Sequence, residues 1–496
     1  MRVSTVPLSQ STITKKKEKE EGSIERIPTG DSVLDSYLSG GFPRNRVIYV
    51  TGNPGTGKTL LASTFIYRGA KNHDEIGLYF SFSETKEVFY SDMKAFGFDF
   101  QSLEESKKFE YIELLTTSKL TTSTISEKIV AALIRLQPKR LVIDSFSSIA
   151  QAQDNPYKAR QMMDTIFSKL ISFTGCTTLV IGEQPTGESG LGIGSEEFVS
   201  DGVLNLKHTL PREMEIRKMR GTKIGRDDLL YTINMKGFQT LKTNLATPDR
   251  PKKWKPISDS GNLLSTGSPD LDRVIGGGFP SGTYVVVEAE SNVSLEEINL
   301  LSHGIAMNFI SQGRGAVFST TGEEAGDGIR NLLVPYLTDE SVSQYLRVVE
   351  YNIVTARKSK PHEHLITNVS DDLGYQRRFS EVYGNLKKTT GRQPIFHWVG
   401  YDTLAGNYAM IASEKVVHKI GSAIAKNRDA KDLTIVLARP SLNILGTIVD
   451  IANWHLKLWK KNGVLLFQGI KPETRIYAID SYIGLGYPVM RLTELN

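Results

Sequence analysis

One stretch of eight residues restricts the fold of this chain more than any other. Residues 52–59, Gly-Asn-Pro-Gly-Thr-Gly-Lys-Thr, fit the pattern G-x-x-x-x-G-K-[ST], which forms a loop around phosphate. Such a loop joins a buried strand to a helix. The apolar run 47–50 fits the strand, and the spacing of Leu60, Leu61 and Phe65 fits the helix. The stretch therefore predicts an α/β domain with a nucleotide site.

The chemistry of this loop follows from its residue types. Glycines let successive backbone N–H groups turn toward an anion, and the start of the next helix adds positive potential. Lys58 has the length to reach the β- and γ-phosphates, and the hydroxyl of Thr59 suits Mg²⁺. We therefore expect a bound nucleotide with Mg²⁺. The expected binding residues are Gly52, Asn53, Pro54, Gly55, Thr56, Gly57, Lys58, Thr59 and Leu60.

Two carboxylates follow predicted strands of the same domain. Asp144 ends the apolar run 140–144, and ligands of open α/β sheets gather at the carboxyl ends of strands. We expect Asp144 to coordinate Mg²⁺, directly or through water. Glu84 follows the run 78–82 and is a candidate general base for the attacking water. For both residues, a helix cap or first-turn position is the alternative.

Alternating strands and helices extend over the region around this loop. The expected strands are 47–51, 78–82, 111–115, 140–144 and 177–182, followed by shorter edge strands at 203–207, 213–219 and 229–233. This order predicts a largely parallel sheet.

The chain then repeats its opening motif. The segment Thr-Gly, Leu-Asp, Gly-Gly-Phe-Pro that begins at Thr29 recurs at Thr266, a constant offset of 237 residues. A duplication of this kind predicts a second α/β domain. Its expected strands are 283–288, 315–320, 346–350, 395–401 and 433–438.

These patterns divide the chain into four parts. Residues 1–23 are polar and charged, and we expect a disordered tail. Residues 24–243 form the first domain, which carries the phosphate loop. Residues 244–258 contain three prolines and predict a linker, and residues 259–496 form the second domain.

The ordered motifs of the first domain resemble those of KaiC-like ATPases of the RecA superfamily. The motifs are the opening segment, the phosphate loop, Phe82-Ser83-Glu84-Thr85, the strand end at Asp144, Glu196 to Asp201, and Arg217 to Thr222. The resemblance is dense over 24–240 and sparse over 260–480. It implies two tandem RecA-like α/β domains, each with a mostly parallel sheet flanked by helices. It also implies ATP with Mg²⁺, and a homo-oligomeric ring, usually a hexamer, with ATP between subunits.

The resemblance also implies roles for single residues. Glu84 matches the second of two adjacent catalytic glutamates, and Ser83 stands at the first. Lys218 and Arg220 match a Lys-x-Arg pair that lies on an edge hairpin and reaches the γ-phosphate bound by the neighbouring subunit. Without the resemblance, this basic stretch is typical of a solvated surface.

The second copy of the loop lacks the residues that bind phosphate. Leu295 replaces Lys58, Glu296 replaces Thr59, and the loop glycines are lost. We expect this domain to keep the fold without the site, as a pseudo-ATPase. The added Glu288, Glu290 and Glu296 are expected to repel a triphosphate. Asp402 and the pair Glu323-Glu324 are remnants near the old carboxylate positions, and residues 467–470 contain no Lys-x-Arg.

The net charge and composition of the chain limit the kinds of partner that we expect. The net charge is +5 over 496 residues, and the glycine-rich loop 187–194 lacks Lys and Arg, which disfavours nucleic acid as a partner without excluding it. Cys176 is the single cysteine. No apolar run approaches the ~20 residues that span a bilayer, and no signal peptide is recognisable. We therefore expect a cytoplasmic location and no membrane partner.

Three functions fit the sequence. The leading hypothesis is an ATP-binding and ATP-hydrolysing ring protein with a regulatory or signalling role. KaiC itself phosphorylates its second domain, and the loss of the second loop argues against that activity here. The alternatives are a DNA-dependent ATPase motor of the recombinase or helicase type and a nucleotide-gated scaffold without significant turnover.

Overall fold

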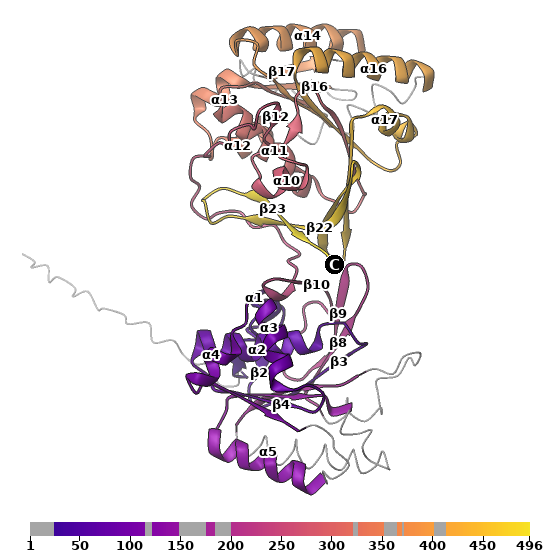
Figure 1. Cartoon of the computed structure of the whole chain (residues 1–496). Helices are drawn as coiled ribbons and strands as arrows, with labels where there is room; N and C mark the ends of the chain where they lie inside the picture. Colours follow the sequence, from indigo (N-terminus) through magenta and orange to yellow (C-terminus); the bar gives the residue numbers. More distant parts are fainter. Residues whose placement is uncertain are drawn as a thin grey trace, which may run out of the picture. The chain divides into compact units, whose positions relative to one another are not determined.

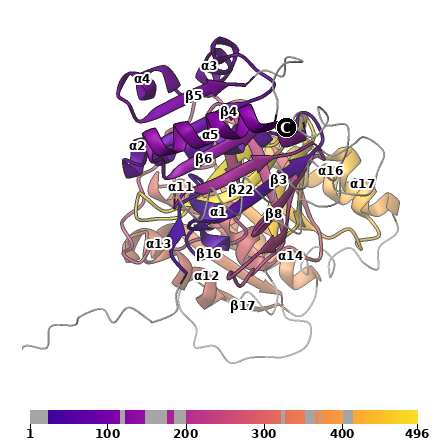
Figure 2. The same ribbon diagram turned by 90° about the horizontal axis from the view of Figure 1, so that it is seen from below.

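The computed structural model describes residues 24–114, 122–147, 175–183, 200–320, 326–351, 365–369, 372–400 and 413–496. The chain forms two compact units, drawn in indigo to magenta and in rose to yellow (Figures 1 and 2). The first holds most of the chain up to Phe238. The second holds Gln239–Asn496 with two short segments, Thr209–Glu213 and Asp228–Ile233. Among the described helices, none combines the length and apolar character needed to cross a membrane.

The phosphate loop belongs to a nine-stranded sheet with the order β11-β10-β9-β8-β3-β7-β6-β4-β5, in which most of β10 and parts of β9 and β11 are grouped with the second unit. Neighbouring strands from β8 to β5 run parallel. The strands are β3 (Val47–Gly52), β4 (Gly77–Ser81), β5 (Phe109–Glu113), β6 (Arg140–Asp144), β7 (Thr177–Ile181), β8 (Gly202–Lys207), β9 (Arg212–Met219), β10 (Asp228–Asn234) and β11 (Gly237–Thr240). β3, β4, β6 and β7 are buried along their whole length, as expected for parallel strands covered on both faces.

Five described helices accompany this sheet: α1 (Ser32–Tyr37), α2 (Lys58–His73), α3 (Lys86–Ala95), α4 (Phe100–Glu105) and α5 (Thr122–Leu136). A small two-stranded sheet of β1 (Arg26–Ile27) and β2 (Phe42–Pro43) precedes β3. The helix α2 directly follows the phosphate loop.

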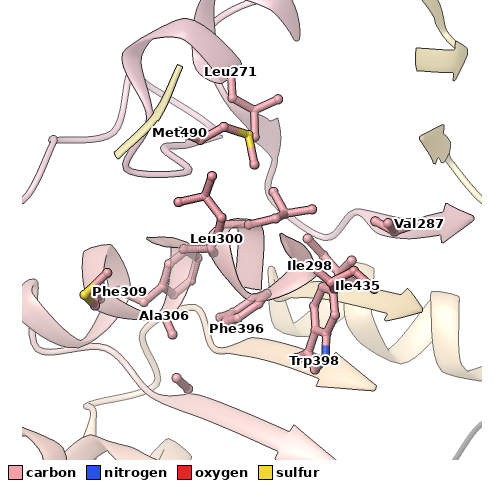
Figure 3. Packing of buried hydrophobic residues seen from close by; sticks show 14 of the residues in the cluster. Leu271, Val287, Ile298, Leu300, Ala306, Phe309, Phe396, Trp398, Ile435 and Met490 are labelled. Carbon is pink, nitrogen blue, oxygen red and sulfur yellow. The ribbon is translucent and has the colours of Figure 1, made fainter. Parts of the chain in front are cut away.

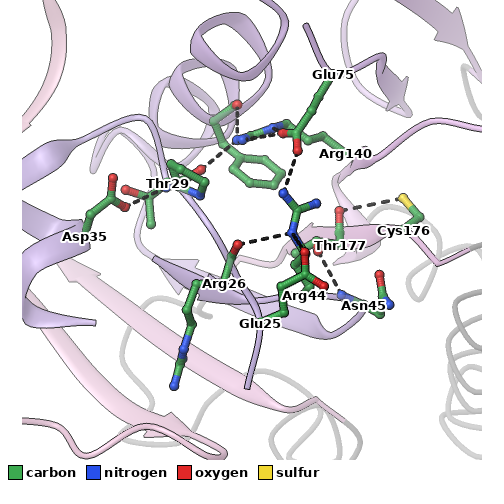
Figure 4. Close-up of polar contacts among 12 residues, drawn as sticks. Glu25, Arg26, Thr29, Asp35, Arg44, Asn45, Glu75, Arg140, Cys176 and Thr177 are labelled. Atoms are coloured by element: carbon green, nitrogen blue, oxygen red, sulfur yellow. Dashed lines mark hydrogen bonds and ion pairs between the residues drawn. The ribbon is translucent and has the colours of Figure 1, made fainter. Parts of the chain in front are cut away.

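A buried arginine fixes α2 against the sheet (Figure 4). Arg140, the first residue of β6, is fully buried and lies 2.7 Å from the carboxylate of Glu75. Its guanidinium also donates to the carbonyl of Phe65 at 2.8 Å and lies over the Phe65 ring. A Cβ on Gly69 of α2 would come within 2.0 Å of Arg140 Nε, so only glycine fits there. This contact lies at the amino end of β6, and Asp144 lies at its carboxyl end.

The repeated opening motif has the same structure in both copies. In each, an aspartate Oδ1 accepts the backbone N–H of the motif threonine: Asp35 from Thr29 at 2.7 Å, and Asp272 from Thr266 at 2.8 Å. The second glycine of each Gly-Gly pair has a positive φ, 121° at Gly41 and 125° at Gly278. A Cβ at either position would collide with the carbonyl of a paired strand. The motif therefore encodes a turn, which explains its presence in both domains.

The second unit is built on a ten-stranded sheet with the order β17-β16-β15-β18-β19-β14-β20-β21-β22-β23. Strands β17 to β20 pair in parallel, and β20 to β23 form an antiparallel meander. The strands are β14 (Tyr284–Ala289), β15 (Ala316–Thr320), β16 (Leu346–Tyr351), β17 (Leu365–Val369), β18 (Phe396–Val399), β19 (Leu433–Ala438), β20 (Trp454–Lys461), β21 (Val464–Lys471), β22 (Glu473–Tyr482) and β23 (Val489–Glu494). A short sheet of β12 (Leu263–Leu264) and β13 (Phe279–Pro280) precedes β14.

The described helices of this unit are α10 (Pro269–Val274), α11 (Leu295–Ser311), α12 (Gly326–Leu333), α13 (Asp339–Tyr345), α14 (Asp372–Thr389), α16 (Ser413–Ala430) and α17 (Leu445–Ile451). The main core lies between the sheet and α11 (Figure 3). Phe396, Trp398 and Ile435 from adjacent strands belong to it, with Ile298 and Phe309 from the helix. Each of these side chains is at most 1 % exposed, so burial of apolar surface is the main stabilising term here.

The two sheets match residue by residue around their central strands. Outward from β3 through β7, β6 and β4, the paired residues are Val47, Thr178, Leu141 and Leu78. Outward from β14 through β19, β18 and β15, they are Tyr284, Thr434, His397 and Val317. Tyr284 is the counterpart of Val47 in the duplication. The strand pairings of the two sheets therefore give each residue near these strands a counterpart in the other domain.

The predicted α/β class with two mostly parallel sheets is confirmed. Each predicted strand is found within two residues of its expected ends, apart from Tyr401 at the end of 395–401, which lies outside the described residues. The meander from β20 to β23 and the edge strand β17 were not predicted. The tail 1–23 also lies outside the described residues, as do Glu196 to Val199, the loop 187–194, Glu323, Glu324 and Asp402.

Candidate nucleotide site

The loop between β3 and α2 leaves the start of its helix open. Gly57 is the N-cap of α2, has a φ of 91° and offers no side chain, and no described side chain caps this end. Gly52 packs closely against β8, because a Cβ there would lie 2.3 Å from the carbonyl oxygen of Leu206. The N-terminus of a 16-residue helix without a side-chain cap is suited to bind an anion.

Lys58 is folded back into this loop. Its Nζ donates to the carbonyl oxygens of Gly52 at 2.8 Å and Asn53 at 3.0 Å, and the side chain is buried. Burial lowers the pKa of Lys58, and the negative charges of Glu183 and Asp144 act in the opposite direction. The cation is thus held beside the open helix start by acceptors that belong to the loop itself.

Asp144 is joined to the loop through one carboxylate oxygen. Its Oδ2 accepts the hydroxyl of Thr59 at 2.8 Å and the phenol of Tyr79 at 2.6 Å. Burial raises the pKa of Asp144, while these two hydrogen bonds and the charge of Lys58 lower it. The peptide bond between Asp144 and Ser145 is cis. The structure therefore brings Thr59 and Asp144 into contact beside Lys58.

Glu84 lies just beyond β4 and is half-buried. Its backbone N–H donates to Ser81 Oγ at 3.0 Å, and its carbonyl oxygen accepts the hydroxyl of Tyr111 at 3.2 Å. The N-cap of α3 is Thr85, so Glu84 is not the cap of that helix. Burial raises the pKa of Glu84, and the charge of Asp144 adds to this effect. A carboxylate with a raised pKa close to the metal-side aspartate is a suitable base for water.

Lys218 and Arg220 lie at the carboxyl end of β9, Lys218 on the strand and Arg220 on the turn that follows. Lys218 Nζ donates to the carbonyl oxygen of Ser200 at 2.7 Å. The guanidinium of Arg220 lies 3.5 Å from Asp201 Oδ1, and its side chain is 59 % exposed. Two motifs that are separate in the sequence, the Lys-x-Arg pair and Ser200-Asp201, therefore contact one another.

Sequence reasoning missed three residues of this site. Tyr79 and Tyr111 hold Asp144 and Glu84, and Glu183 places its charge near Lys58. A signal existed for the tyrosines, because a phenol at a buried strand position requires a hydrogen-bond partner. Glu183 follows β7, and its N–H donates to Ser147 Oγ at 2.7 Å.

The corresponding loop of the second domain is closed by its own side chains. Ser294 caps α11 by accepting the N–H of Glu297, and the Glu297 carboxylate accepts the N–H of Ser294. A guanidinium also enters this loop. Arg439 Nη1 donates to three carbonyl oxygens, those of Ala289 at 3.3 Å, Glu290 at 2.7 Å and Val293 at 3.2 Å.

The matched strand pairings of the two sheets show which residues differ between the two loops. Ala289 and Glu290 are the counterparts of the two residues whose carbonyls Lys58 contacts. Arg439 follows β19 at the position that Glu183 occupies after β7. The lysine in the loop is thus replaced by Leu295, and the glutamate on the neighbouring strand is replaced by an arginine. A cation remains beside the loop, but it comes from a different element.

The counterpart of Asp144 in the second domain is not a carboxylate. Gly400 occupies the position of Asp144, Phe318 that of Tyr79, and Glu296 that of Thr59. Two of the added glutamates have side-chain partners: Glu288 lies 2.9 Å from His455 Nε2, and Glu290 pairs with Lys457 at 3.4 Å. Their repulsion is therefore weaker than the sequence suggested, and the loss of phosphate donors is the main change.

Comparison with known proteins agrees with this geometry. Residues 27–244 match the family model described as the KaiC ATPase. The circadian clock oscillator protein KaiC of Prochlorococcus marinus strain SARG is 24 % identical over 368 residues, which cover 68 % of this chain and 71 % of the relative. The same protein of strain MIT 9313 is 26 % identical over 310 residues, 60 % of each chain. The first domain therefore belongs to the KaiC-like family of the RecA superfamily.

The family model matches the first domain. A crystal structure of a KaiC-like protein from Pyrococcus horikoshii OT3 is 30 % identical and covers 44 % of this chain and all of that chain, with a TM-score of 0.41. Other KaiC relatives align over 270 residues, so the chain spans about half of their length. The resemblance read from the motifs is confirmed at the level of the KaiC-like family.

Proposed function

We propose that the chain hydrolyses ATP at the loop between β3 and α2, with Mg²⁺, and that the second domain binds no nucleotide. One observation carries this proposal. The start of α2 is open beside Lys58 and the Thr59–Asp144 pair, whereas the start of α11 is capped and its loop is filled by Arg439. An open helix start with an adjacent cation favours a polyphosphate.

The residues present fit Mg²⁺. Hydroxyl and carboxylate oxygens are the protein ligands that this ion prefers, and Thr59 Oγ1 and Asp144 Oδ2 lie 2.8 Å apart. Thr59 would ligate the ion, and Asp144 would hold it directly or through water. When bound, the ion neutralises charge on the phosphates as it develops.

The chain's own residues would then act in sequence. Lys58 would move its Nζ from the carbonyls of Gly52 and Asn53 to the β- and γ-phosphates. Glu84 would accept a proton from water while the water oxygen bonds to the γ-phosphorus and the bond to ADP breaks. Positive charge at the γ-phosphate would stabilise the transition state more than the ground state.

We further propose that this positive charge comes from Lys218 and Arg220 of a neighbouring copy in a homo-oligomeric ring, as a hexamer. The exposure of Arg220 supports this arrangement, since more than half of its side chain is open to solvent. A regulatory or signalling role for the ring, with a protein partner, is part of the same proposal. The second domain would then act as an architectural unit that presents a surface to that partner.

Mixed subunits test the shared site. Arg220→Ala and Glu84→Gln each remove most hydrolysis, but mixtures of the two should recover part of it. Some interfaces then contain an intact arginine and an intact glutamate. Arg217→Ala is the matched control, because Arg217 lies on the same strand and pairs with Glu215 at 3.2 Å. It should leave hydrolysis close to the wild type.

Failure to recover activity in mixed rings that are shown to form would contradict the shared site. Tight ATP binding by the wild type with no turnover would instead favour a nucleotide-gated scaffold. Stimulation of hydrolysis by single-stranded DNA, with salt-sensitive binding, would favour a DNA motor.

A further inference from the structure

Two tyrosines lie between the two candidate catalytic carboxylates. Tyr79 of β4 and Tyr111 of β5 are direct partners in the parallel ladder. Their rings are stacked, with centroids 5.3 Å apart and planes inclined by 16°. Tyr79 is fully buried and Tyr111 is 5 % exposed. Phenol groups this deeply buried are costly unless their hydroxyls find partners.

The hydroxyl of Tyr79 contacts Asp144, the carboxylate proposed to hold Mg²⁺. It lies 2.6 Å from Asp144 Oδ2, the oxygen that also accepts the hydroxyl of Thr59. If Thr59 turns toward Mg²⁺, Tyr79 remains as a donor to that oxygen. A donor fixed by ring packing restricts the rotation of the carboxylate.

The hydroxyl of Tyr111 contacts Glu84, the residue proposed to accept a proton from water. It donates to the carbonyl oxygen of Glu84 at 3.2 Å. The N–H of Glu84 is held by Ser81 Oγ, so the backbone of Glu84 is fixed on both sides. The stacked rings therefore connect the segment that positions Glu84 to the side chain of Asp144.

The second domain offers an internal comparison. Phe318 of β15 and Val348 of β16 are direct partners at the positions of Tyr79 and Tyr111. Both hydroxyls are absent where Gly400 stands in place of Asp144. The same sheet therefore packs without the two phenols, so their hydroxyls are not required by the fold, and the hydroxyl of Tyr79 is absent together with the carboxylate that it contacts.

We propose that Tyr79 and Tyr111 are positioning residues, Tyr79 for the metal-side carboxylate Asp144 and Tyr111 for the water-side carboxylate Glu84. The inference rests on the proposed ATPase function. It assigns a separate effect to each hydroxyl: Tyr79 acts on the Mg²⁺ dependence, and Tyr111 acts on the turnover rate.

The test removes one hydroxyl at a time. Tyr79→Phe should raise the Mg²⁺ concentration for half-maximal hydrolysis about tenfold, with kcat at saturating Mg²⁺ changed by less than about twofold. Tyr111→Phe should lower kcat about fivefold and leave the Mg²⁺ dependence unchanged. Tyr67→Phe is the matched control: Tyr67 lies on α2 of the same domain and stacks on Phe98. It should change neither quantity.

A second readout separates this inference from the proposed function. Mg²⁺ is titrated into each full-length variant with ADP, and nucleotide affinity is measured by calorimetry. Tyr79→Phe should shift the Mg²⁺ dependence of ADP binding, even if the wild type does not turn over ATP. An unchanged Mg²⁺ dependence in Tyr79→Phe would overturn the role of Tyr79. A wild type that binds ADP but lacks hydrolysis would contradict the ATPase proposal alone.

Thermal unfolding completes the test. If Tyr79→Phe and Tyr111→Phe lose stability and change kcat and Mg²⁺ dependence together, the tyrosines are structural and the inference is wrong. If stability is kept and the two effects separate as described, the inference holds.

Discussion

The two loops that join a central strand to the following helix begin and end at matching positions, yet they are held by different groups. In the first domain, Lys58 reaches back from α2 to the carbonyls of Gly52 and Asn53. In the second, Arg439 reaches across from the end of β19 to the matching carbonyls and to one more. The first cation belongs to the helix that would receive the phosphates. The second belongs to a neighbouring strand.

This difference teaches how a phosphate loop is lost without loss of the fold. Carbonyl oxygens buried in a loop need donors, so the removal of lysine has to be compensated. Arg439 supplies the donors, and Ser294 with Glu297 caps the helix. The cap occupies backbone N–H groups that a phosphate would need, and the Arg439 guanidinium fills the loop. We therefore expect that restoring a single residue of the second loop does not reopen it.

The largest expected effect compares the two equivalent positions directly. Lys58→Met removes the ammonium and keeps an apolar stem, so ATP hydrolysis should fall by roughly 100- to 1000-fold. Leu295→Met, the matched change in the second loop, should leave hydrolysis within about twofold of the wild type. Steady-state phosphate release measures both. Normal turnover in Lys58→Met would remove the first loop from the mechanism.

The next largest expected effect is on the number of nucleotides bound per chain. Saturating ATP with Mg²⁺ should fill one site per chain, and Lys58→Met should weaken that binding severely. Chelation of Mg²⁺ should weaken binding in the wild type, because the phosphate charge is then less neutralised. Calorimetry of the full-length chain counts the sites. Two sites per chain would show that the second loop opens, and would make phosphorylation within the second domain possible again.

Arg439, which fills the second loop, allows the two loops to be compared by measuring protein stability. Arg439→Ala removes the guanidinium that donates to three carbonyl oxygens, so the unfolding free energy of the second domain should fall by about 2–3 kcal/mol. Adding Leu295→Lys to this variant should recover part of the loss, since Lys58 contacts the matching carbonyls in the first domain. Arg428→Ala, an exposed arginine of α16, is the control. No change in the denaturation midpoint of Arg439→Ala would contradict a closing role.

The smallest effect concerns the helix cap. Ser294→Ala should destabilise the second domain by about 1 kcal/mol, whereas Ser294→Gly should cost only a few tenths. The glycine variant copies Gly57 of the first loop, but it should still bind no nucleotide because Arg439 remains. Denaturation measures the stability of both variants, and calorimetry measures nucleotide binding by Ser294→Gly. Nucleotide binding by Ser294→Gly would show that the cap alone closes the loop.

Much of the fold and part of the site could be predicted from the sequence. The central strands, the phosphate loop and the candidate role of Asp144 rest on local signals: a short apolar run, a glycine pattern and a carboxylate at a strand end. Each signal lies within about ten residues, so it can be read without knowing which strands are neighbours.

The tertiary structure alone decided which distant groups meet. Tyr79 and Asp144 are 65 residues apart, and Arg439 and Val293 are 146 residues apart. These contacts depend on the strand order of each sheet, which does not follow the order of the chain. The apolar run of one strand shows that its residues are buried, but it does not show which strand lies beside it. For that reason the sequence located the phosphate loop and its lost copy, while the partners that hold each loop emerged only from the fold.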